Sequence, residues 1–330
     1  MKTVFETTQW ESLYPYQQEK LHREYADYLI RNKESGKYVH DKCPKCGSEN
    51  PRFTKGGFSN SGKQMVRCSE CRARTVVDYG QLTYYSYQDQ SKWDQLVEDT
   101  FSQVSKMDTA AKLNVSPKTA WRMRMKLLHA LESLVANTVV KDEVEMDEKY
   151  LLNSHKGLKI DGVKPRLRGT PASKRGFSDE QICLAIGVQR LGSSVLIATN
   201  TGNPSSEGLM KLADHLSEKS LVWVDGKKSY NALLTAKNCD VRVLGDHKTY
   251  TSVDHLNNVN SFHTMIDRWY GKYRGVASKY LNRYTALFTL VREYAGCDIQ
   301  EILLSITKRL RGIKDYFYIR QMWTEDLFVY

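Results

Sequence analysis

Three polar side chains stand where separate elements could bring them to one point. Residues 221–226, Leu-Val-Trp-Val-Asp-Gly, form an apolar run that ends in Asp225 and a glycine, which is typical of a buried strand followed by a turn. Apolar and charged residues alternate through Asp147 in residues 144–152, and Asn260 lies near the start of a long helical pattern. Two carboxylates and an amide oxygen are ligands that suit Mg²⁺. Taken alone, an Asp before glycine is also typical of a structural turn.

Four cysteines form a second chemical pattern. They occur as two C-x-x-C pairs, Cys43 with Cys46 and Cys68 with Cys71. Each pair presents two thiolates to one ion, and two pairs complete a tetrahedral Zn²⁺ site with no open position, so we predict structural zinc rather than a redox dithiol. The zinc ribbon built on this site is expected to have three short strands, at residues 53–58, 64–67 and 76–79.

The elements that must position the two carboxylates and the amide follow one order. Strands are predicted at 144–152, 181–190 and 194–200, then a helix at 205–220, the Asp225 strand, a short helix from Ser229, a strand at 240–246 and the helix that carries Asn260. This βββαβαβα order resembles a ribonuclease-H-like fold. The resemblance implies that acids of the first and fourth strands share one site with a residue of a late helix.

Residues 108–124 are predicted to form a helix-turn-helix. Asn114 suits the turn, Ser116 suits a helix N-cap, and Pro117 suits the first position of the second helix. An αα-hairpin with a solvated basic face is the alternative. The second helix should bury Ala120, Met123, Leu127 and Leu131. It should present to the major groove a basic face made of Lys118, Arg122, Lys126 and His129.

These motifs together resemble the insertion-sequence transposases of the ISXO2-like, or IS1595, type. The resemblance rests on Asp147 in VEMDEKYL, Asp225 in VWVDG, Asn260 in VNSFH and the run RGVASKYL at 274–281, and it extends over most of residues 36–290. It implies a metal-dependent DNA transposase that binds terminal inverted repeats, cleaves DNA and transfers strands. In that scheme Asp147 bridges two Mg²⁺ or Mn²⁺ ions, Asp225 holds one, and Asn260 offers its carbonyl oxygen to the other.

One position departs from the family pattern. Seven residues after Asn260, where the family typically has Lys, this chain has Asp267, followed by Arg268. Two helical turns separate positions 260 and 267, so they share a side of the helix. We expect Asp267 to be a surface residue or an additional acid, and Arg268 and Lys272 to contact DNA. The departure keeps a second function open: a catalytically decayed or domesticated transposase that acts as a sequence-specific DNA-binding protein. A nuclease or resolvase of the same fold is a third.

Composition sets the class of protein and its partners. The chain has 330 residues and a net charge of +11, which predicts several domains and a polyanionic partner, here double-stranded DNA. It contains no apolar run as long as a membrane span and no apolar run typical of a signal peptide. Cys183, Cys239 and Cys297 are expected to be reduced thiols. We therefore expect a cytoplasmic, nucleoid-associated bacterial protein that acts on DNA as a homodimer or higher oligomer.

The fold class predicted from these parts is a multidomain α+β and α/β chain. The Lys-, Arg- and Gly-rich insertion at 153–177 either clamps DNA phosphates or stays solvated. The aromatic residues of 262–295 either stack on bases or, as we favour, pack against the domain. The expected units are an N-terminal helical segment at 1–35, a zinc ribbon at 36–80, a helix-turn-helix domain at 81–137, a ribonuclease-H-like catalytic domain at 138–295 and a C-terminal helical tail at 296–330.

Overall fold

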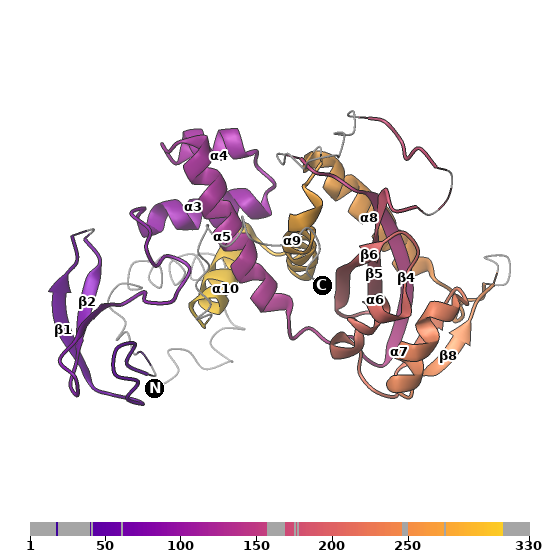
Figure 1. The fold of residues 1–330 in the computed structure, drawn as a ribbon, viewed down its shortest axis with the longest axis horizontal. Helices are drawn as coiled ribbons and strands as arrows, with labels where there is room; N and C mark the ends of the chain where they lie inside the picture. Colours follow the sequence, from indigo (N-terminus) through magenta and orange to yellow (C-terminus); the bar gives the residue numbers. More distant parts are fainter. Residues whose placement is uncertain are drawn as a thin grey trace.

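The computed structural model describes residues 18, 40, 42–60, 62–156, 169–174, 176, 178–245, 250–273 and 275–312. The predictions for the N-terminal helix, the centre of the basic insertion, residue 274 and the segment after residue 312 lie outside this part. Three groups of elements follow one another along the molecule: a small strand module, a group of helices, and a larger unit of strands and helices (Figure 1).

The small module is an antiparallel sheet of order β1-β2-β3, with β1 at Phe53–Phe58, β2 at Gln64–Cys68 and β3 at Arg74–Val76. The two hairpin strands lie where they were predicted, but the prediction of the third strand at 76–79 was wrong. Thr75 is buried opposite Val66, and the chain turns after Val76, where the Tyr79 N–H donates to the Val76 carbonyl. Pairing with β2 therefore fixes an earlier strand than the apolar pattern indicated.

The helical group contains α3 (Gln90–Phe101), α4 (Lys106–Lys112) and α5 (Pro117–Val135). Ser116 caps α5 by accepting from the Thr119 N–H, and proline occupies the first turn, as the sequence predicts. Asn114, in the turn between α4 and α5, has a φ of 49°, a left-handed conformation that asparagine tolerates. All four apolar positions predicted to be buried on the second helix are buried: Ala120, Met123, Leu127 and Leu131.

The larger unit is built on a five-stranded sheet of order β6-β5-β4-β7-β8. Its central strand β4 pairs antiparallel with β5 and parallel with β7, while β6 is antiparallel to β5 and β8 is parallel to β7. Strands and helices follow one another along the chain in the predicted βββαβαβα order. The strand bounds are Glu143–Leu152 for β4, Gln181–Gln189 for β5, Ser194–Thr201 for β6, Leu221–Val224 for β7 and Asp240–Val243 for β8.

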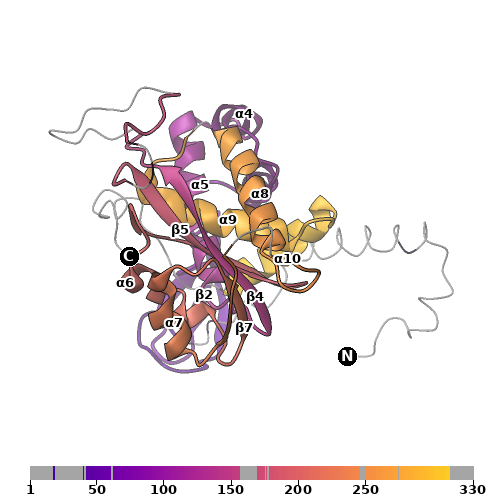
Figure 2. The ribbon, with the colours of Figure 1, turned by 90° about the vertical axis from the view of Figure 1, so that its right-hand side faces the viewer.

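Helices cover both faces of this sheet (Figure 2). On one face, α8 (Asn257–Tyr273) and α9 (Leu281–Glu293) pack on apolar side chains of β5; on the other, α6 (Ser206–Met210) and α7 (Asn231–Ala236) pack on β4 and β7.

Two element lengths predicted from the sequence were wrong. The helix predicted at 205–220 stops early, because Leu216 is drawn into a parallel bridge with Val140 and the His215 ring bonds the Thr138 carbonyl. The predicted last strand also ends early, at Val243.

The helical group and the sheet unit share one apolar core. Arg283 on α9 is buried and donates to Glu132 on α5 at 3.2 Å, so these two helices meet between the units. The last helix, α10 (Ile299–Gly312), packs back on α3 and α5 and buries Leu310. The segment predicted as a C-terminal tail thus completes the helical group, as far as residue 312.

The aromatic residues of α8 and α9 form a packed cluster. Trp269 contacts Tyr270, Tyr273, Tyr284 and Phe288 with ring centroids 4.7–6.5 Å apart, in edge-to-face or tilted arrangements. Trp269 and Phe288 are buried, which supports the packing interpretation over base stacking. Among the helices of the described residues, none is long and apolar enough to cross a membrane.

Candidate active site and metal centre

The register of two parallel strands brings Asp147 and Asp225 together. Glu145 of β4 pairs with Trp223 of β7, so two residues further along each strand Asp147 lies level with Asp225. The β7 strand ends at Val224, and Asp225 therefore stands at its carboxyl end beside the continuing edge of β4. An acidic side chain at the carboxyl end of a parallel strand is well placed for a ligand, and here a second acid stands beside it on β4.

A third carboxylate joins this pair. Oxygen atoms of Asp147, Glu148 and Asp225 all lie within 4.8 Å of one another, a grouping that could hold a metal ion. Asp147 and Asp225 are partly exposed, at 18% and 31%, whereas the Glu148 side chain is fully buried. Sequence patterns did not single out Glu148, because strand alternation directs the side chains of adjacent residues such as Asp147 and Glu148 to opposite faces.

Lys227 also belongs to this acidic cluster. Its Nζ lies 2.9 Å from Asp225 Oδ2 and 3.5 Å from Asp147 Oδ1, and it donates a hydrogen bond to Glu148 Oε2. Burial acts to lower the pKa of Lys227, but the hydrogen bonds to Glu148 and Asp225 outweigh it and raise the pKa above its ordinary value. The ammonium and any bound cation would share the same carboxylate oxygens.

The buried carboxyl group of Glu148 is electrostatically distinct from its neighbours. Burial raises its pKa above the ordinary value, while the hydrogen bond and charge of Lys227 act in the opposite direction. The negative charge of Asp147 raises it further. Since a divalent cation favours the ionised form, metal binding would lower this pKa.

Helix α8 runs alongside β4 and carries Asn260 past Asp147. Near the start of the helix, the Asn258 N–H donates to Glu145 at 2.8 Å; further along, Lys149 meets Asp267 at 2.6 Å. Four strand residues and nine helical residues both advance by about 13 Å, at roughly 3.3 and 1.5 Å per residue. The helix and the strand therefore advance by equal lengths between these two contacts. Asp147, between Glu145 and Lys149 on the strand, lies level with the helical turn between positions 260 and 263.

The surroundings of Asn260 agree with this alignment. Asn260 is exposed on α8 and its side chain bonds Tyr250, whose pKa is raised first by burial and then by the charges of Asp147 and Asp225. His263, one turn later, has its pKa lowered by burial, and Asp147 acts against that shift. The charge of Asp147 thus acts on both Tyr250 and His263, the neighbours of Asn260, while the role of Asn260 as a metal ligand stays a prediction.

Asp267 has a different partner from the acidic cluster. It is more than half exposed and forms an ion pair with Lys149, which lies two residues after Asp147 on the same face of β4. Of the two expectations for Asp267, the structure supports the surface residue and leaves it out of the carboxylate group that could hold a metal. The chain therefore has a Lys–Asp ion pair between β4 and α8, in which the strand supplies the Lys and the helix supplies the Asp.

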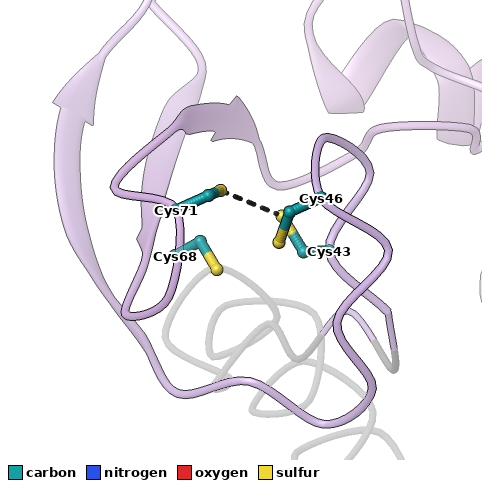
Figure 3. Close-up of side chains that lie close together, drawn as sticks. All are labelled: Cys43, Cys46, Cys68 and Cys71. Carbon is teal, nitrogen blue, oxygen red and sulfur yellow. Dashed lines mark hydrogen bonds between the residues drawn. The ribbon is translucent and has the colours of Figure 1, made fainter.

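The four cysteines of the strand module converge as predicted. Their sulfur atoms lie within 4.8 Å of one another, and Cys43 Sγ and Cys71 Sγ are 3.7 Å apart (Figure 3). Tetrahedral Zn²⁺ with Zn–S bonds of ~2.3 Å requires sulfurs about 3.8 Å apart, so the arrangement fits this ion. Burial acts to raise the pKa of Cys43, but N–H donors from Cys46 and Lys45 and neighbouring thiols lower it to about 6, which favours the thiolate.

With this geometry in place, the comparison with known families is decisive. Residues 139–290 match the model of the ISXO2-like transposase domain. Residues 139–290 are an ISXO2-like transposase domain. It is also 26% identical over 270 residues, 73% of this chain and 90% of the other, to an uncharacterized protein in transposable element ISH50 of Halobacterium salinarum. Asp147, Asp225 and Asn260 all lie inside the matched transposase domain.

Solved structures of the Mos1 transposase share weaker likeness with the chain. The paired-end complex with the left transposon end has 12% identity and a TM-score of 0.21, covering 68% of this chain and 80% of that one. The strand transfer complex has 14% identity and a TM-score of 0.23, covering 68% and 79%. These scores are too low for structural detail to be transferred to the ISXO2-like domain.

The predicted DNA-contacting residues of this transposase separate into two groups. Lys118 and Arg122 are exposed near the start of α5. Lys126 turns inward instead and donates to the Tyr84 carbonyl at 3.1 Å, and His129 lies 3.5 Å from Glu132. The single basic face predicted on α5 was therefore wrong, because the second half of the helix packs against other elements. On α8, both predicted residues are exposed, Arg268 and Lys272.

The basic insertion is tied to the sheet unit where it leaves β4. The Ser154 carbonyl accepts from the Ser278 N–H at 2.8 Å, and Lys156 Nζ donates to the Gly275 carbonyl at 2.9 Å. Residues 157–168 lie outside the described part, so the prediction of a phosphate clamp stays a prediction there.

Sequence patterns did not single out three residues at or beside the site: Glu145, Glu148 and Lys227. Each stands within two positions of a predicted ligand, and that proximity was the available signal.

Proposed function

We propose that this transposase cleaves DNA and transfers strands by metal-dependent phosphoryl transfer, with Asp147, Asp225 and Asn260 as the catalytic residues. The observation that carries the proposal is the convergence of Asp147, in the middle of β4, and Asp225, at the carboxyl end of the adjacent parallel strand β7. A sheet of order β6-β5-β4-β7-β8 with an antiparallel second strand supports a ribonuclease-H-like catalytic domain.

The residues fit Mg²⁺ or Mn²⁺ because the three clustered acids offer carboxylate oxygens, the ligands that these hard cations prefer. When bound, two such ions stabilise the attacking and leaving oxygens of a phosphodiester. Asp147 on β4 and Asp225 after β7 hold fixed negative charge, and Asn260 adds a neutral oxygen from α8. Glu148 is a fourth oxygen donor, buried behind the other two acids. A bound cation would compete with the Lys227 ammonium for the oxygens of Asp147 and Asp225.

The zinc ribbon and the helix-turn-helix supply DNA binding in this proposal. Cys43, Cys46, Cys68 and Cys71 hold structural Zn²⁺, which fixes the position of the ribbon strands. Lys118 and Arg122 sit at the start of α5, the end that a helix-turn-helix presents to the major groove. Arg268 and Lys272 on the exposed side of α8 contact phosphates near the metal site. DNA ends and target DNA are the partners, and the transposase acts on them as a dimer or higher oligomer.

The test is a cleavage and strand-transfer assay on the DNA that flanks the element, with Mg²⁺ or Mn²⁺. Wild-type protein is expected to give cleaved and joined products, and Asp225→Asn is expected to give none while still binding the ends. Asp240→Asn is the matched control, because Asp240 is exposed on β8, away from the acidic cluster. Products from Asp225→Asn at the wild-type rate would refute the catalytic assignment.

The alternative is a catalytically decayed or domesticated transposase that acts as a sequence-specific DNA-binding protein. Asn260 in place of an acid and the commitment of Asp267 to Lys149 favour it. It predicts salt-dependent binding of the DNA ends with no product from the wild type in either metal.

A further inference from the structure

Glu145 is a buried carboxylate whose role the phosphoryl-transfer scheme leaves unassigned. It lies two residues before Asp147, so both side chains leave the same face of β4. Its side chain is fully buried, at 0% exposure. Burying an ionised carboxylate costs several kcal/mol unless hydrogen bonds and an opposite charge offset the loss of water.

The N-terminus of α8 supplies those hydrogen bonds. Glu145 Oε2 accepts from the backbone N–H groups of Asn258 and Val259, at 2.8 and 3.1 Å, and Oε1 accepts from Asn258 Nδ2 at 2.7 Å. The first N–H groups of a helix have no partner within it, and the helix dipole places positive potential there. A side chain of the strand thus caps the helix that carries Asn260.

Arg190, which follows β5, completes the arrangement. Its Nε donates to Glu145 Oε1 at 2.9 Å, while its other nitrogens donate to the carbonyls of Val253 and His255 at 2.8 and 3.0 Å. The guanidinium also stacks on the Trp223 ring, 3.7 Å from its centroid. One cation therefore ties the strand carboxylate to the backbone that leads into α8.

Trp223 links these contacts to β7, the strand that leads to Asp225. Its Nε1 donates to Asp254 Oδ1 at 2.9 Å, which holds the same loop before α8. Trp223 lies two residues before Asp225, as Glu145 lies two residues before Asp147. Asn258, in turn, lies two residues before Asn260. Each proposed ligand thus lies two positions after a residue that takes part in these connected contacts: Glu145, Trp223 or Asn258.

We propose that Glu145 is a positioning residue that fixes α8 against β4, so that Asn260 meets the metal held by Asp147 and Asp225. The proposal rests on the proposed function, because it assigns Asn260 to the same site. Glu145 does not touch the metal or the DNA. It acts by setting the distance between two ligand-bearing elements, and the Lys149–Asp267 pair further along α8 assists at the other end.

The experiment compares Glu145→Gln with wild type in two Mn²⁺ titrations, one of metal binding to the protein alone and one of DNA cleavage. Loss of a group that orients metal ligands typically weakens metal binding or activity by roughly 10- to 100-fold. We expect the half-saturating Mn²⁺ concentration to rise by this factor in both titrations, while binding of the DNA ends stays unchanged.

Glu132→Gln is the matched control. It makes the same Glu-to-Gln change at a carboxylate that accepts from a buried arginine, Arg283 Nε at 3.2 Å, between α5 and α9. Its Mn²⁺ half-saturation should equal that of wild type. If Glu145→Gln lowers stability in urea yet keeps the wild-type half-saturation, Glu145 is merely structural and the proposal is overturned.

A second variant decides the matter if Glu145→Gln fails to fold. Asn258 is exposed, so Asn258→Ala removes one hydrogen bond to Glu145 without leaving a void. A few-fold rise in half-saturating Mn²⁺ would support the proposal, and no rise would overturn it. Wild-type protein that takes up no Mn²⁺ would refute the proposed function itself, an outcome distinct from a variant that behaves like wild type.

Discussion

Replacing Lys126 by methionine should stabilise the transposase at neutral pH. Lys126 lies on α5 with its ammonium turned to the Tyr84 carbonyl. Burial lowers its pKa from 10.5 to about 8, and the charge of Lys63 acts in the same direction. A folded-state pKa below the unfolded value means that the unfolded chain binds more protons between these two values. Stability therefore rises with pH across that window, and below it the charged side chain is a net cost.

The size of the effect follows from the two pKa values. The difference, 10.5 − 8 = 2.5 units, corresponds to about 3 kcal/mol at ~1.4 kcal/mol per unit. Partial exposure of Lys126 and loss of its hydrogen bond reduce the expected gain of Lys126→Met to about 2 kcal/mol at pH 7. Because the neutral amine keeps the bond to Tyr84, the advantage of methionine should shrink above pH 8 and vanish towards pH 10.5.

Urea unfolding of both proteins at about pH 7 and about pH 10 measures this difference. The exposed Arg122 provides the control on the same helix. Arg122→Met should leave stability unchanged but reduce the salt dependence of DNA binding by about one phosphate contact, whereas Lys126→Met should leave that dependence intact. A less stable Lys126→Met at neutral pH, or a reduced salt dependence equal to that of Arg122→Met, would refute the inward placement of Lys126.

Two further predictions concern the metal sites. Lys227→Met should raise the Mn²⁺ affinity of the acidic cluster roughly tenfold in calorimetry without DNA, because the ammonium no longer competes for the oxygens of Asp147 and Asp225; unchanged affinity would mean that Lys227 moves aside freely. Cys68→Ser should release Zn²⁺ and remove hydrogen-exchange protection from the ribbon strands, whereas Cys297→Ser, at an exposed cysteine outside the group of four, should retain both. Retained zinc in Cys68→Ser would exclude the four-cysteine site.

The meeting of Asp147 and Asp225 could be predicted from the sequence because Asp147 lies in an alternating strand pattern and Asp225 ends an apolar one. Parallel neighbours in one sheet place such residues at the same edge, and the observed register sets the two acids level. The cysteine cluster was predictable for a similar reason, since two C-x-x-C pairs leave few ways to satisfy one tetrahedral ion. In both cases the spacing of residues along the chain was enough to predict which side chains meet.

Tertiary contacts determined the features that local spacing could not predict, namely where a helix ends and which side chains of a helix are covered. The helix predicted at 205–220 ends before Leu216, because Leu216 pairs with Val140, a residue far away in the chain. Lys126 has the spacing of an exposed basic face, yet it lies where α5 meets the turn around Tyr84. Helical periodicity specifies which residues share a side but says nothing of where along its length a neighbouring segment covers that side.

The same limit explains why Glu145 was missed although its acidic neighbour Asp147 was found. Positions 143, 145, 147 and 149 share one face of β4, and every one of them is charged. Their side-chain exposures in the fold are 54%, 0%, 18% and 21%, so alternation alone could not rank them. The buried one is the residue beneath the N-terminus of α8, where unpaired N–H groups and Arg190 make a buried carboxylate favourable. Those partners lie 45 and 113 positions away in the chain, which is why only the fold separates the carboxylate beneath α8 from the one that joins Asp225 and Glu148 in the acidic cluster.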